Sequence, residues 1–244
     1  MKNLTDIQGV IFDYGGTIDT NSRHWAEVLW SKYEELHVPV DKPVFREAYV
    51  HGERTLARQP LVKPDYDFHD VLRVKTRVQM DWLVENGKLS RQEADSENYA
   101  VRIADGCYNY VLEVLKRTRP VVETLSKHYK LVLVSNFYGN IETVLKDFGL
   151  DGFFSHIVES SVVGVRKPDP AIYRLGVEAM GLPAERVLVV GDSFSKDVVP
   201  AKKVGCKVAW LKGEGWGNEE TDDSLPDIVI TDLPDLLPYL IVNN

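Results

Sequence analysis

Residues 9–19 read GVIFDYGGTID, and the organisation of the rest of the chain is best understood from this segment. Val10, Ile11 and Phe12 form a short run of β-branched and aromatic residues between turn residues, a pattern typical of a fully buried strand. This strand would carry Asp13 at its carboxyl end, where open α/β sheets bind their ligands. The glycines that follow allow the backbone to turn tightly and to approach a ligand closely. Asp13 is therefore a candidate site residue.

Composition and charge limit the classes of protein to which the chain can belong. Of its 244 residues, 44% are hydrophobic and 27% are charged, proportions typical of a soluble globular protein. The formal net charge of -8 argues against a nucleic-acid partner. We find no signal-peptide pattern and no apolar run long enough to span a bilayer, so we expect a cytoplasmic protein without membrane contact. Cys107 and Cys206 lie far apart without CxxC spacing and are expected to be buried free thiols.

The region between residues 20 and 117 has helical patterns and no convincing strand. Apolar residues recur at helical spacing in segments 21–36, 43–58 and 67–86, and Asn21 or Ser22 would cap the first of these helices. The sequence Ser90-Arg91-Gln92-Glu93 has the form of a capping box. It predicts a long helix towards Arg117, with a break near Gly106 left open.

Strand patterns return after Arg119-Pro120, where Pro120 is expected to open a short helix that runs to His128. Apolar runs predict strands at 131–134, 157–158, 187–190, 207–211 and 228–230, and helical spacing predicts helices at 141–148, 170–180, 195–204 and 233–240. Strands that alternate with helices imply right-handed crossovers and a mainly parallel sheet. We therefore predict an α/β protein with a Rossmann-like, doubly wound core. Residues 1–18 and 118–244 would form this core, and residues 19–117 an inserted α-helical domain.

Polar residues at the predicted strand ends suggest one shared site. Strands of a parallel sheet end at the same edge, so Asp13, Ser135 and Asp192 can converge there, together with Lys167 and Asp197 from the following loops. Two carboxylates suit Mg²⁺, which keeps several waters and shares its ligands with a phosphate. A lysine can bind phosphate and balance the carboxylates. The set suits phosphoryl transfer in which Asp13 attacks phosphorus.

At this point the chain resembles the haloacid dehalogenase superfamily, through four motifs in order. They are Asp13-Tyr14-Gly15-Gly16-Thr17 after a hydrophobic strand, Ser135-Asn136 after another, Lys167 in Arg-Lys-Pro-Asp-Pro, and Gly191-Asp192-Ser193 followed by Asp197. The resemblance covers about residues 1–18 and 118–244. The insertion lies where this superfamily carries its helical C1 cap.

The resemblance implies a role for each motif residue. Asp13 would be the nucleophile and a Mg²⁺ ligand, Gly15 would ligate through its carbonyl oxygen, and Asp192 would be the third protein ligand. Asp197 would orient these ligands or join them. The residues expected to bind the substrate are Gly16, Thr17, Ser135, Asn136 and Lys167, with Ser135 and Lys167 on the transferring phosphoryl group. The implied substrate is a small phosphorylated metabolite, and the implied protein is a monomer or homodimer.

One position departs from the superfamily's pattern. Its phosphatases usually carry a second Asp two residues after the nucleophile, which protonates the leaving group and later activates water, but this chain has Gly15 there. General acid–base help of this kind is typically worth about 10²- to 10⁴-fold in rate. The carbonyl ligand survives the change, because every residue supplies one. We therefore expect the chain to bind the metal and phosphate even though its hydrolysis of phosphate monoesters would be inefficient.

Three interpretations follow from Gly15. The favoured one is a phosphatase for substrates with good leaving groups, such as acyl phosphates or phosphoanhydrides, or one that recruits Asp19 or a cap residue as the acid. The second is other superfamily chemistry: the first motif is similar to the Asp-Trp-Ala-Gly-Thr of phosphonoacetaldehyde hydrolases, which need a Schiff-base lysine, for which Lys42 and Lys63 are available. The dehalogenase branch fits less well, because Asp192 is retained. The third is a non-catalytic binding module.

Two weaker signals are interpreted structurally. The glycine-rich segment 213–217 follows a late strand and opens no evident helix, so we expect a mobile loop near the site rather than a nucleotide-binding turn. His51, Arg54 and Arg58 are interpreted as a solvated helix face.

Overall fold

The computed structural model describes residues 4, 6–215 and 220–241, so the end of the glycine-rich segment 213–217 lies outside the described residues. Within them the chain forms one parallel sheet in the order β3-β2-β1-β4-β5-β6. The strands are β1 (Gly9–Phe12), β2 (Lys130–Ser135), β3 (His156–Glu159), β4 (Val187–Gly191), β5 (Lys207–Leu211) and β6 (Ile228–Ile230). Each strand predicted from an apolar run is confirmed, as is the α/β class.

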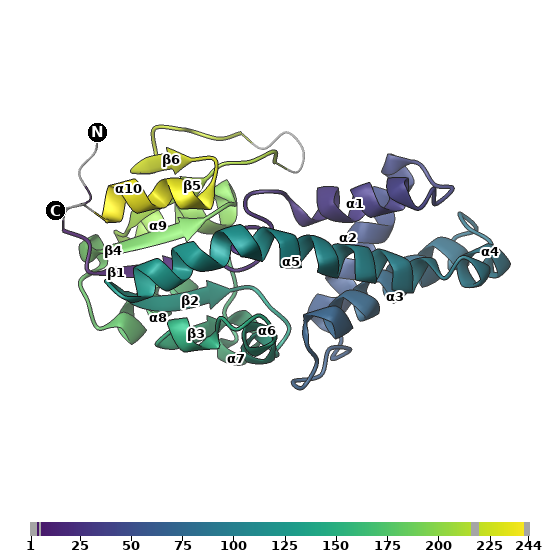
Figure 1. Cartoon of the computed structure of the whole chain (residues 1–244), viewed down its shortest axis with the longest axis horizontal. Helices are drawn as coiled ribbons and strands as arrows, with labels where there is room; N and C mark the ends of the chain where they lie inside the picture. Colours follow the sequence, from purple (N-terminus) through teal and green to yellow (C-terminus); the bar gives the residue numbers. More distant parts are fainter. Residues whose placement is uncertain (1–3, 5, 216–219, 242–244) are drawn as a thin grey trace.

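Side chains of the central strands alternate between two hydrophobic layers, which makes the sheet doubly wound. Val10 and Phe12 pack in one layer with residues of α5 (Tyr99–Ser126) and α10 (Leu237–Leu240). Ile11 packs in the other layer with residues of α8 (Ala171–Met180) and α9 (Val199–Val204). Figure 1 shows the same arrangement, with helices on both faces of the sheet. Because β1 is covered on both faces, all three of these side chains are fully buried.

Five helices lie between β1 and β2. The first four and the start of the fifth project beyond the carboxyl edge of the sheet, whereas the end of the fifth lies over one face of the sheet (Figure 1). The five are α1 (Trp25–Glu35), α2 (Lys42–Arg58), α3 (Phe68–Glu85), α4 (Arg91–Ser96) and α5 (Tyr99–Ser126). We keep the division into a core and a cap of residues 19–117 as a proposal. No helix of the described residues is both long enough and apolar enough to cross a membrane.

The prediction of one long helix that begins at Ser90 and runs towards Arg117 is wrong. Ser90 caps only α4, and the chain breaks at Asn98, which has a left-handed φ of 50°, rather than near Gly106. The predicted boundary at Pro120 is also wrong, because α5 continues through it to Ser126. Val122 and Leu125, beyond the proline, are fully buried against the sheet layer, and this packing offsets the missing backbone N–H.

The start of α1 also differs from the prediction. The helix begins at Trp25, with the side chain of His24 accepting a hydrogen bond from the backbone N–H of Ala26. Asn21 and Ser22 both have positive φ angles and lie in the preceding turns. The side chain of Asn21 instead bonds Asp232 and the backbone of Leu233, so it is not available as a cap.

The remaining helices surround the sheet, and all of them except α7 lie within segments that were predicted to be helical. They are α6 (Ile141–Asp147), α7 (Ser160–Val163), α8 (Ala171–Met180), α9 (Val199–Val204) and α10 (Leu237–Leu240), with short 3-10 turns at Asp151–Phe153, Ala184–Arg186 and Leu233–Leu236. A π-helical turn, Phe194–Val198, precedes α9 where an unbroken α-helix was predicted. This turn contains Asp197, which is completely buried.

Candidate active site

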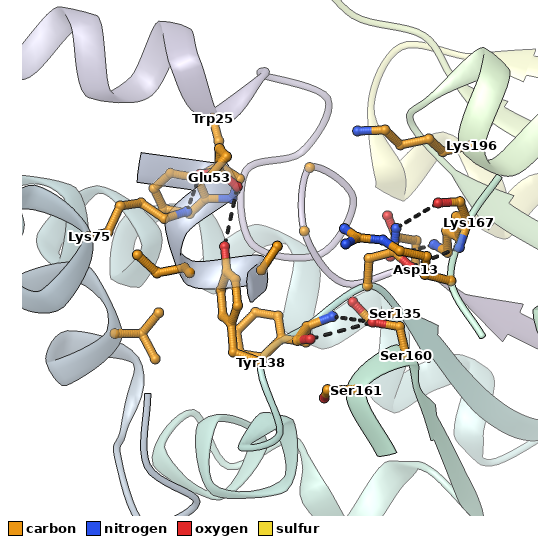
Figure 2. A pocket seen from close by; sticks show the side chains of 18 of the residues that line it. Asp13, Trp25, Glu53, Lys75, Ser135, Tyr138, Ser160, Ser161, Lys167 and Lys196 are labelled. Carbon is orange, nitrogen blue, oxygen red and sulfur yellow. Dashed lines mark hydrogen bonds and ion pairs between the residues drawn. The ribbon is translucent and has the colours of Figure 1, made fainter. Parts of the chain in front are cut away.

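The carboxyl edge of the sheet opens into a cavity of about 980 Å³. Figure 2 shows Asp13 and Lys167 on one side of this cavity, and Glu53 and Lys75 on the other. The first side comes from the strand ends. The second comes from α2 and α3, so the cavity lies between the sheet edge and the helices inserted after β1.

Strand register places Asp13 between two other predicted site residues. Phe12 pairs with Leu133 of β2 and with Val190 of β4, so Asp13 emerges beside the ends of both strands. Its backbone N–H donates to the carbonyl of Val190 at 2.9 Å, which extends the ladder to the site. Ser135 and Asp192 follow on these neighbouring strands, as the sequence predicted.

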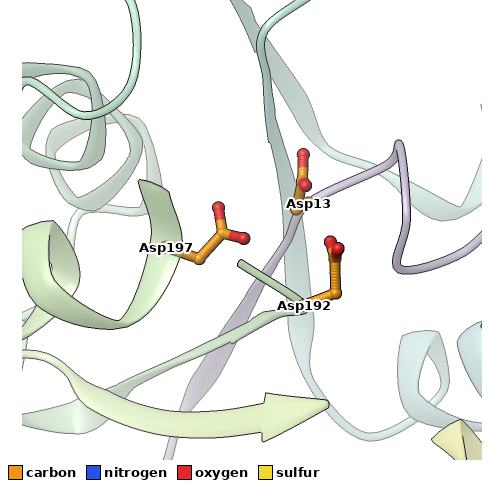
Figure 3. A group of neighbouring side chains, drawn as sticks. All are labelled: Asp13, Asp192 and Asp197. Atoms are coloured by element: carbon orange, nitrogen blue, oxygen red, sulfur yellow. The ribbon is translucent and has the colours of Figure 1, made fainter. Parts of the chain in front are cut away.

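Three carboxylates meet at this edge (Figure 3). One oxygen each from Asp13, Asp192 and Asp197 lies within 4.8 Å of the other two. Such a set of carboxylate oxygens could hold a hard divalent cation. Gly15 lines the same cavity, so the residue expected to add a carbonyl ligand is close by.

Lys167 forms ion pairs with two of these carboxylates, those of Asp13 and Asp197. Its Nζ lies 2.7 Å from Asp13 Oδ1 and 2.7 Å from Asp197 Oδ1, and the lysine is only 4% exposed. Asp197 also accepts from the Tyr173 hydroxyl at 2.6 Å and from the backbone N–H of Ser193 at 2.9 Å. Both oxygens of Asp197 are therefore engaged by donors of the protein itself.

Burial and mutual repulsion shift the acid–base properties of the cluster. Burial raises the pKa of Asp13 to about 6, and Lys167 only partly offsets this effect. The pKa of Asp192 is raised by burial and then by Asp197 and Asp13. Burial would lower the pKa of Lys167, but the two neighbouring carboxylates outweigh it and raise that pKa. Three carboxylates and one ammonium leave negative charge that a divalent cation would balance.

The predicted phosphate-binding residues differ in what they contact. Ser135 and Gly16 line the cavity, and Ser135 is 1% exposed. Asn136 also lines it, but its side chain accepts from the backbone N–H of Lys167 at 2.9 Å and donates to that residue's carbonyl at 3.1 Å. Thr17 is completely buried and donates to Asp192 Oδ1 at 3.0 Å. Asn136 and Thr17 thus hold the lysine and a carboxylate in place.

The two adjacent glycines of the first motif have different environments. Gly16 has a φ of +95°, and a Cβ built there would lie 2.5 Å from the carboxyl carbon of Asp192. Only glycine fits this position without displacing Asp192. At Gly15 no heavy atom lies within 4 Å of such a Cβ, and its φ is outside the left-handed range. The fold therefore does not require glycine at position 15.

A second cluster, on the far side of the cavity, was not predicted from the sequence. Lys75 Nζ lies 2.7 Å from Glu53 Oε1, and the Tyr138 hydroxyl donates to Glu53 Oε2 at 3.2 Å (Figure 2). Lys75 is a buried member of the apolar stripe of α3, between Val71 and Gln79. A charged residue on the buried face of a helix is the signal that could have identified this cluster.

Comparison with known proteins supports what the geometry indicates. The family model of haloacid dehalogenase-like hydrolases matches residues 7–205. The chain belongs to this family. Among its haloacid dehalogenase-like relatives, the 5-amino-6-(5-phospho-D-ribitylamino)uracil phosphatase YigB of Escherichia coli (strain K12) is 30% identical over 171 residues, which are 69% of this chain and 70% of that protein.

Two further haloacid dehalogenase-like proteins match nearly the whole chain. A phosphoglycolate phosphatase of Pectobacterium atrosepticum is 28% identical over 98% of this chain and 95% of its own length. The crystal structure of a HAD phosphatase from Thermococcus onnurineus is 26% identical, with a TM-score of 0.53 over 96% of this chain and 98% of that one. The chain is therefore a hydrolase of the phosphatase type.

Lys42 and Lys63, the two lysines named as available for a Schiff base, do not line the cavity. Lys42 pairs with Glu27 at 2.6 Å, and Lys63 lies 5.4 Å from the ring centre of Tyr66. Lys75 does border it, but Glu53 raises the lysine's pKa well above its usual value in spite of burial. An amine that stays protonated cannot attack a carbonyl, so this environment disfavours phosphonoacetaldehyde hydrolase chemistry.

The residues interpreted as a solvated helix face are indeed exposed. Arg54 and Arg58 also border the cavity, whereas the ring of His51 lies 6.1 Å from that of Trp82. Both cysteines are buried free thiols, as expected.

Proposed function

We propose that this hydrolase is a Mg²⁺-dependent phosphatase that cleaves a small phosphorylated metabolite through an aspartyl-phosphate on Asp13. The observation that carries the proposal is the buried Lys167 ammonium, 2.7 Å from both Asp13 and Asp197, beside the third carboxylate of Asp192. It supports roles for Asp13 as the nucleophile, for Lys167 as the cation that binds phosphate and for Asp192 as a metal ligand at one sheet edge.

The donor atoms divide into metal ligands and groups that position them. Asp13, Asp192 and the carbonyl of Gly15 would hold the cation, which when bound would neutralise charge on the phosphoryl oxygens. Asp197 is better placed as a positioning residue, because Lys167, Tyr173 and Ser193 already donate to its oxygens. It fixes the ammonium beside Asp13.

The reaction would proceed in two displacements at phosphorus. An oxygen of ionised Asp13 forms a bond to phosphorus, and the bond from phosphorus to the leaving-group oxygen breaks, with its electron pair departing on that oxygen. Lys167 and the Ser135 hydroxyl donate hydrogen bonds to the phosphoryl oxygens. Water then attacks the phosphorus of the aspartyl-phosphate, which releases inorganic phosphate and restores the carboxylate.

The rate of the first displacement should depend strongly on the leaving group. With Gly15 no carboxylic acid stands two residues after the nucleophile, so the departing oxygen receives no proton from that position. Acyl phosphates leave as stabilised carboxylates and need little protonation, whereas alkyl phosphates leave as basic alkoxides. We therefore propose turnover that falls steeply as the pKa of the leaving group rises.

Steady-state release of phosphate from acetyl phosphate, p-nitrophenyl phosphate and glycerol 1-phosphate, with and without Mg²⁺, tests this function. We expect Mg²⁺-dependent turnover in that order, and loss of turnover in Asp13→Asn with an unchanged circular dichroism spectrum. Activity that persists in Asp13→Asn would remove Asp13 as the nucleophile. Equal rates for acetyl and glycerol phosphate would show that the missing acid is replaced. A lack of turnover on every phosphate would favour the binding module.

A further inference from the structure

Four of the cations that line the active-site cavity have no carboxylate partner. They are Arg54 and Arg58 of α2, Arg166 beside the buried Lys167, and Lys196 of the π-helical turn. All four are exposed, and none of them forms an ion pair within the part of the chain that the structure describes. Because the whole chain carries a formal net charge of -8, this group of unpaired cations is a local departure that favours an anionic ligand.

The other charged groups of the cavity already have counter-charges. Lys167 and a divalent cation would balance the three carboxylates of the sheet edge, and the ammonium of Lys75 lies 2.7 Å from Glu53 Oε1. Burial raises the pKa of Asp19 to about 7, so this carboxyl group is only partly ionised near neutral pH. The four unpaired cations are therefore left to attract negative charge that a ligand carries in addition to the phosphoryl group at Asp13.

Two of the four, Arg166 and Lys196, belong to the segments that build the phosphoryl site. Arg166 directly precedes Lys167, whose backbone N–H and carbonyl both bond the Asn136 side chain, at 2.9 and 3.1 Å. Lys196 directly precedes the buried Asp197 in the π-helical turn. Figure 2 shows the Lys196 side chain extending into the cavity from the same side as Asp13 and Lys167. The backbone positions of both cations are thus set by the site itself.

A leaving group that is itself a phosphate fits both this charge and the glycine at position 15. Gly15 supplies no proton, so a leaving oxygen is favoured if it is stable without one. The second pKa of a phosphate is about 6, so a departing phosphate oxygen is stable in its ionised form at neutral pH. Cations placed beforehand stabilise the negative charge that develops on it. An alkyl phosphate with a carboxylate would also attract the cations, but its alkoxide would still need a proton.

We infer that the substrate is a phosphoanhydride, and that Arg166 and Lys196 bind the phosphate that leaves. The inference rests on the proposed function, since it assigns the substrate class of the same site. An oxygen of Asp13 forms a bond to the terminal phosphorus, the bond from that phosphorus to the bridging oxygen breaks, and its electron pair stays on the bridging oxygen. The leaving phosphate takes this charge away from the two cations, and water later releases the other phosphate from Asp13.

Inorganic pyrophosphate and acetyl phosphate distinguish recognition of charge from leaving-group strength. Neither of their leaving groups needs a proton, but only pyrophosphate carries an anionic group at its leaving end. At a fixed concentration of free Mg²⁺ we expect a KM for pyrophosphate that is lower by about fivefold or more, a modest factor because both cations are exposed to water. Added salt should reduce this difference. An equal or lower KM for acetyl phosphate would overturn the inference.

A matched set of variants tests whether the two cations form a site. Lys196→Gln and Arg166→Gln should each raise the KM for pyrophosphate about threefold more than the KM for acetyl phosphate. Both side chains are exposed, so the variants should fold, which circular dichroism checks. Arg54→Gln is the control, because it removes an equally exposed and unpaired charge on α2, on the opposite side of the cavity. A rise as large in this control would mean that the cavity attracts anions only through its general field, and would overturn the assignment.

A binding measurement distinguishes failure of this inference from failure of the proposed function. Methylenediphosphonate has a carbon bridge in place of the bridging oxygen, so its calorimetric binding, with equal Mg²⁺ in both solutions, needs no turnover. We expect binding that Lys196→Gln weakens about threefold. The same result in a protein that hydrolyses neither acetyl phosphate nor pyrophosphate would sink the proposed function and retain the diphosphate site. Turnover of acetyl phosphate without binding of methylenediphosphonate would do the reverse.

Discussion

Gly15 and Gly16 are neighbours in the loop after β1, yet only one of them must be glycine. No atom lies within 4 Å of a Cβ built at Gly15, so Gly15→Asp should fold normally. Its carboxyl group would supply the missing acid, and we expect turnover of glycerol 1-phosphate to rise, by up to about 10²- to 10⁴-fold. Acetyl phosphate should gain much less, because its leaving group needs little protonation.

The matched control for this prediction is an alanine at each position. Gly15→Ala adds a methyl group in open space and should keep the activity of the wild type. Gly16→Ala forces a Cβ onto the Asp192 carboxylate and should lose most Mg²⁺-dependent turnover. If Gly15→Asp folds and binds Mg²⁺ but hydrolyses glycerol 1-phosphate no faster, another group already acts as the acid.

Asp19 should make the stability of the protein depend on pH. Burial raises the pKa of Asp19 to about 7 from 3.8, although Gly16 N–H and Trp25 Nε1 donate to it at 2.7 and 2.8 Å. The unfolded chain therefore ionises first, and the free energy of unfolding falls as pH rises from about 4 to about 7, by roughly 4 kcal/mol from this group. Urea unfolding of wild type and Asp19→Asn without Mg²⁺, at both ends of this range, measures the effect. A variant with the same pH slope would contradict the assignment.

Sequence could predict the residues of one side of the site but not those of the other. Asp13, Ser135 and Asp192 follow apolar strands, and parallel strands end at one edge, so their convergence follows from local patterns. Glu53, Lys75 and Tyr138 come from α2, α3 and a loop, and their meeting depends on how these elements pack. Local periodicity carries no information on that packing.

At the scale of elements, α5 shows that tertiary packing can keep a helix continuous through a helix-breaking residue. Proline in a helix interior is about 3 kcal/mol less favourable than alanine, yet α5 passes through Pro120 to Ser126. The side chain of Pro120 is exposed to solvent. Two residues earlier, the Thr118 hydroxyl donates a hydrogen bond to the carbonyl of Ile18 at 2.7 Å. A helix boundary was predicted here because the proline signal is local in sequence, whereas the burial of Val122 and Leu125 depends on tertiary packing.

Pro120→Ala should stabilise the protein. The substitution restores a backbone donor within α5 and removes a helix-breaking ring, which should gain about 3 kcal/mol, less about 1 kcal/mol for the greater freedom of the unfolded chain. We expect the free energy of unfolding to rise by about 2 kcal/mol in urea titrations. Alanine at Lys116, whose side chain is 70% exposed on the same helix, is the control and should change it little. A destabilised Pro120→Ala would mean that the proline fits a bend that alanine does not.

At the scale of the whole molecule, the alternation of strands and helices was sufficient to predict a parallel α/β fold with helices on both faces. The exact first and last residues of the helices could not be predicted from this alternation. The π-helical turn Phe194–Val198 illustrates the reason, since its shape accompanies the burial of Asp197 against Lys167 and Tyr173. Those contacts join residues far apart in the chain, and no local propensity reports them.

The charge imbalance at the sheet edge should make Mg²⁺ a stabilising ligand of the whole fold. A ligand at about a hundred times its Kd adds about 2.7 kcal/mol, which corresponds to a rise in Tm of roughly 5–10 °C for a protein of this size. Thermal unfolding with excess Mg²⁺ and with EDTA measures this rise. Asp192→Asn removes one carboxylate of the cluster and should reduce it strongly. No shift at saturating Mg²⁺ in the wild type would argue against the metal site.

The open space at Gly15 also has a meaning in terms of the genetic code. The glycine codons GGU and GGC each become an aspartate codon by a single base change, and the loop has room for the Cβ atom of the new side chain. Neither mutational distance nor steric hindrance therefore keeps a carboxylate out of this position. The reason for its absence has to be sought in the reaction that the protein performs, which makes position 15 a natural point from which to evolve a general phosphomonoesterase in the laboratory.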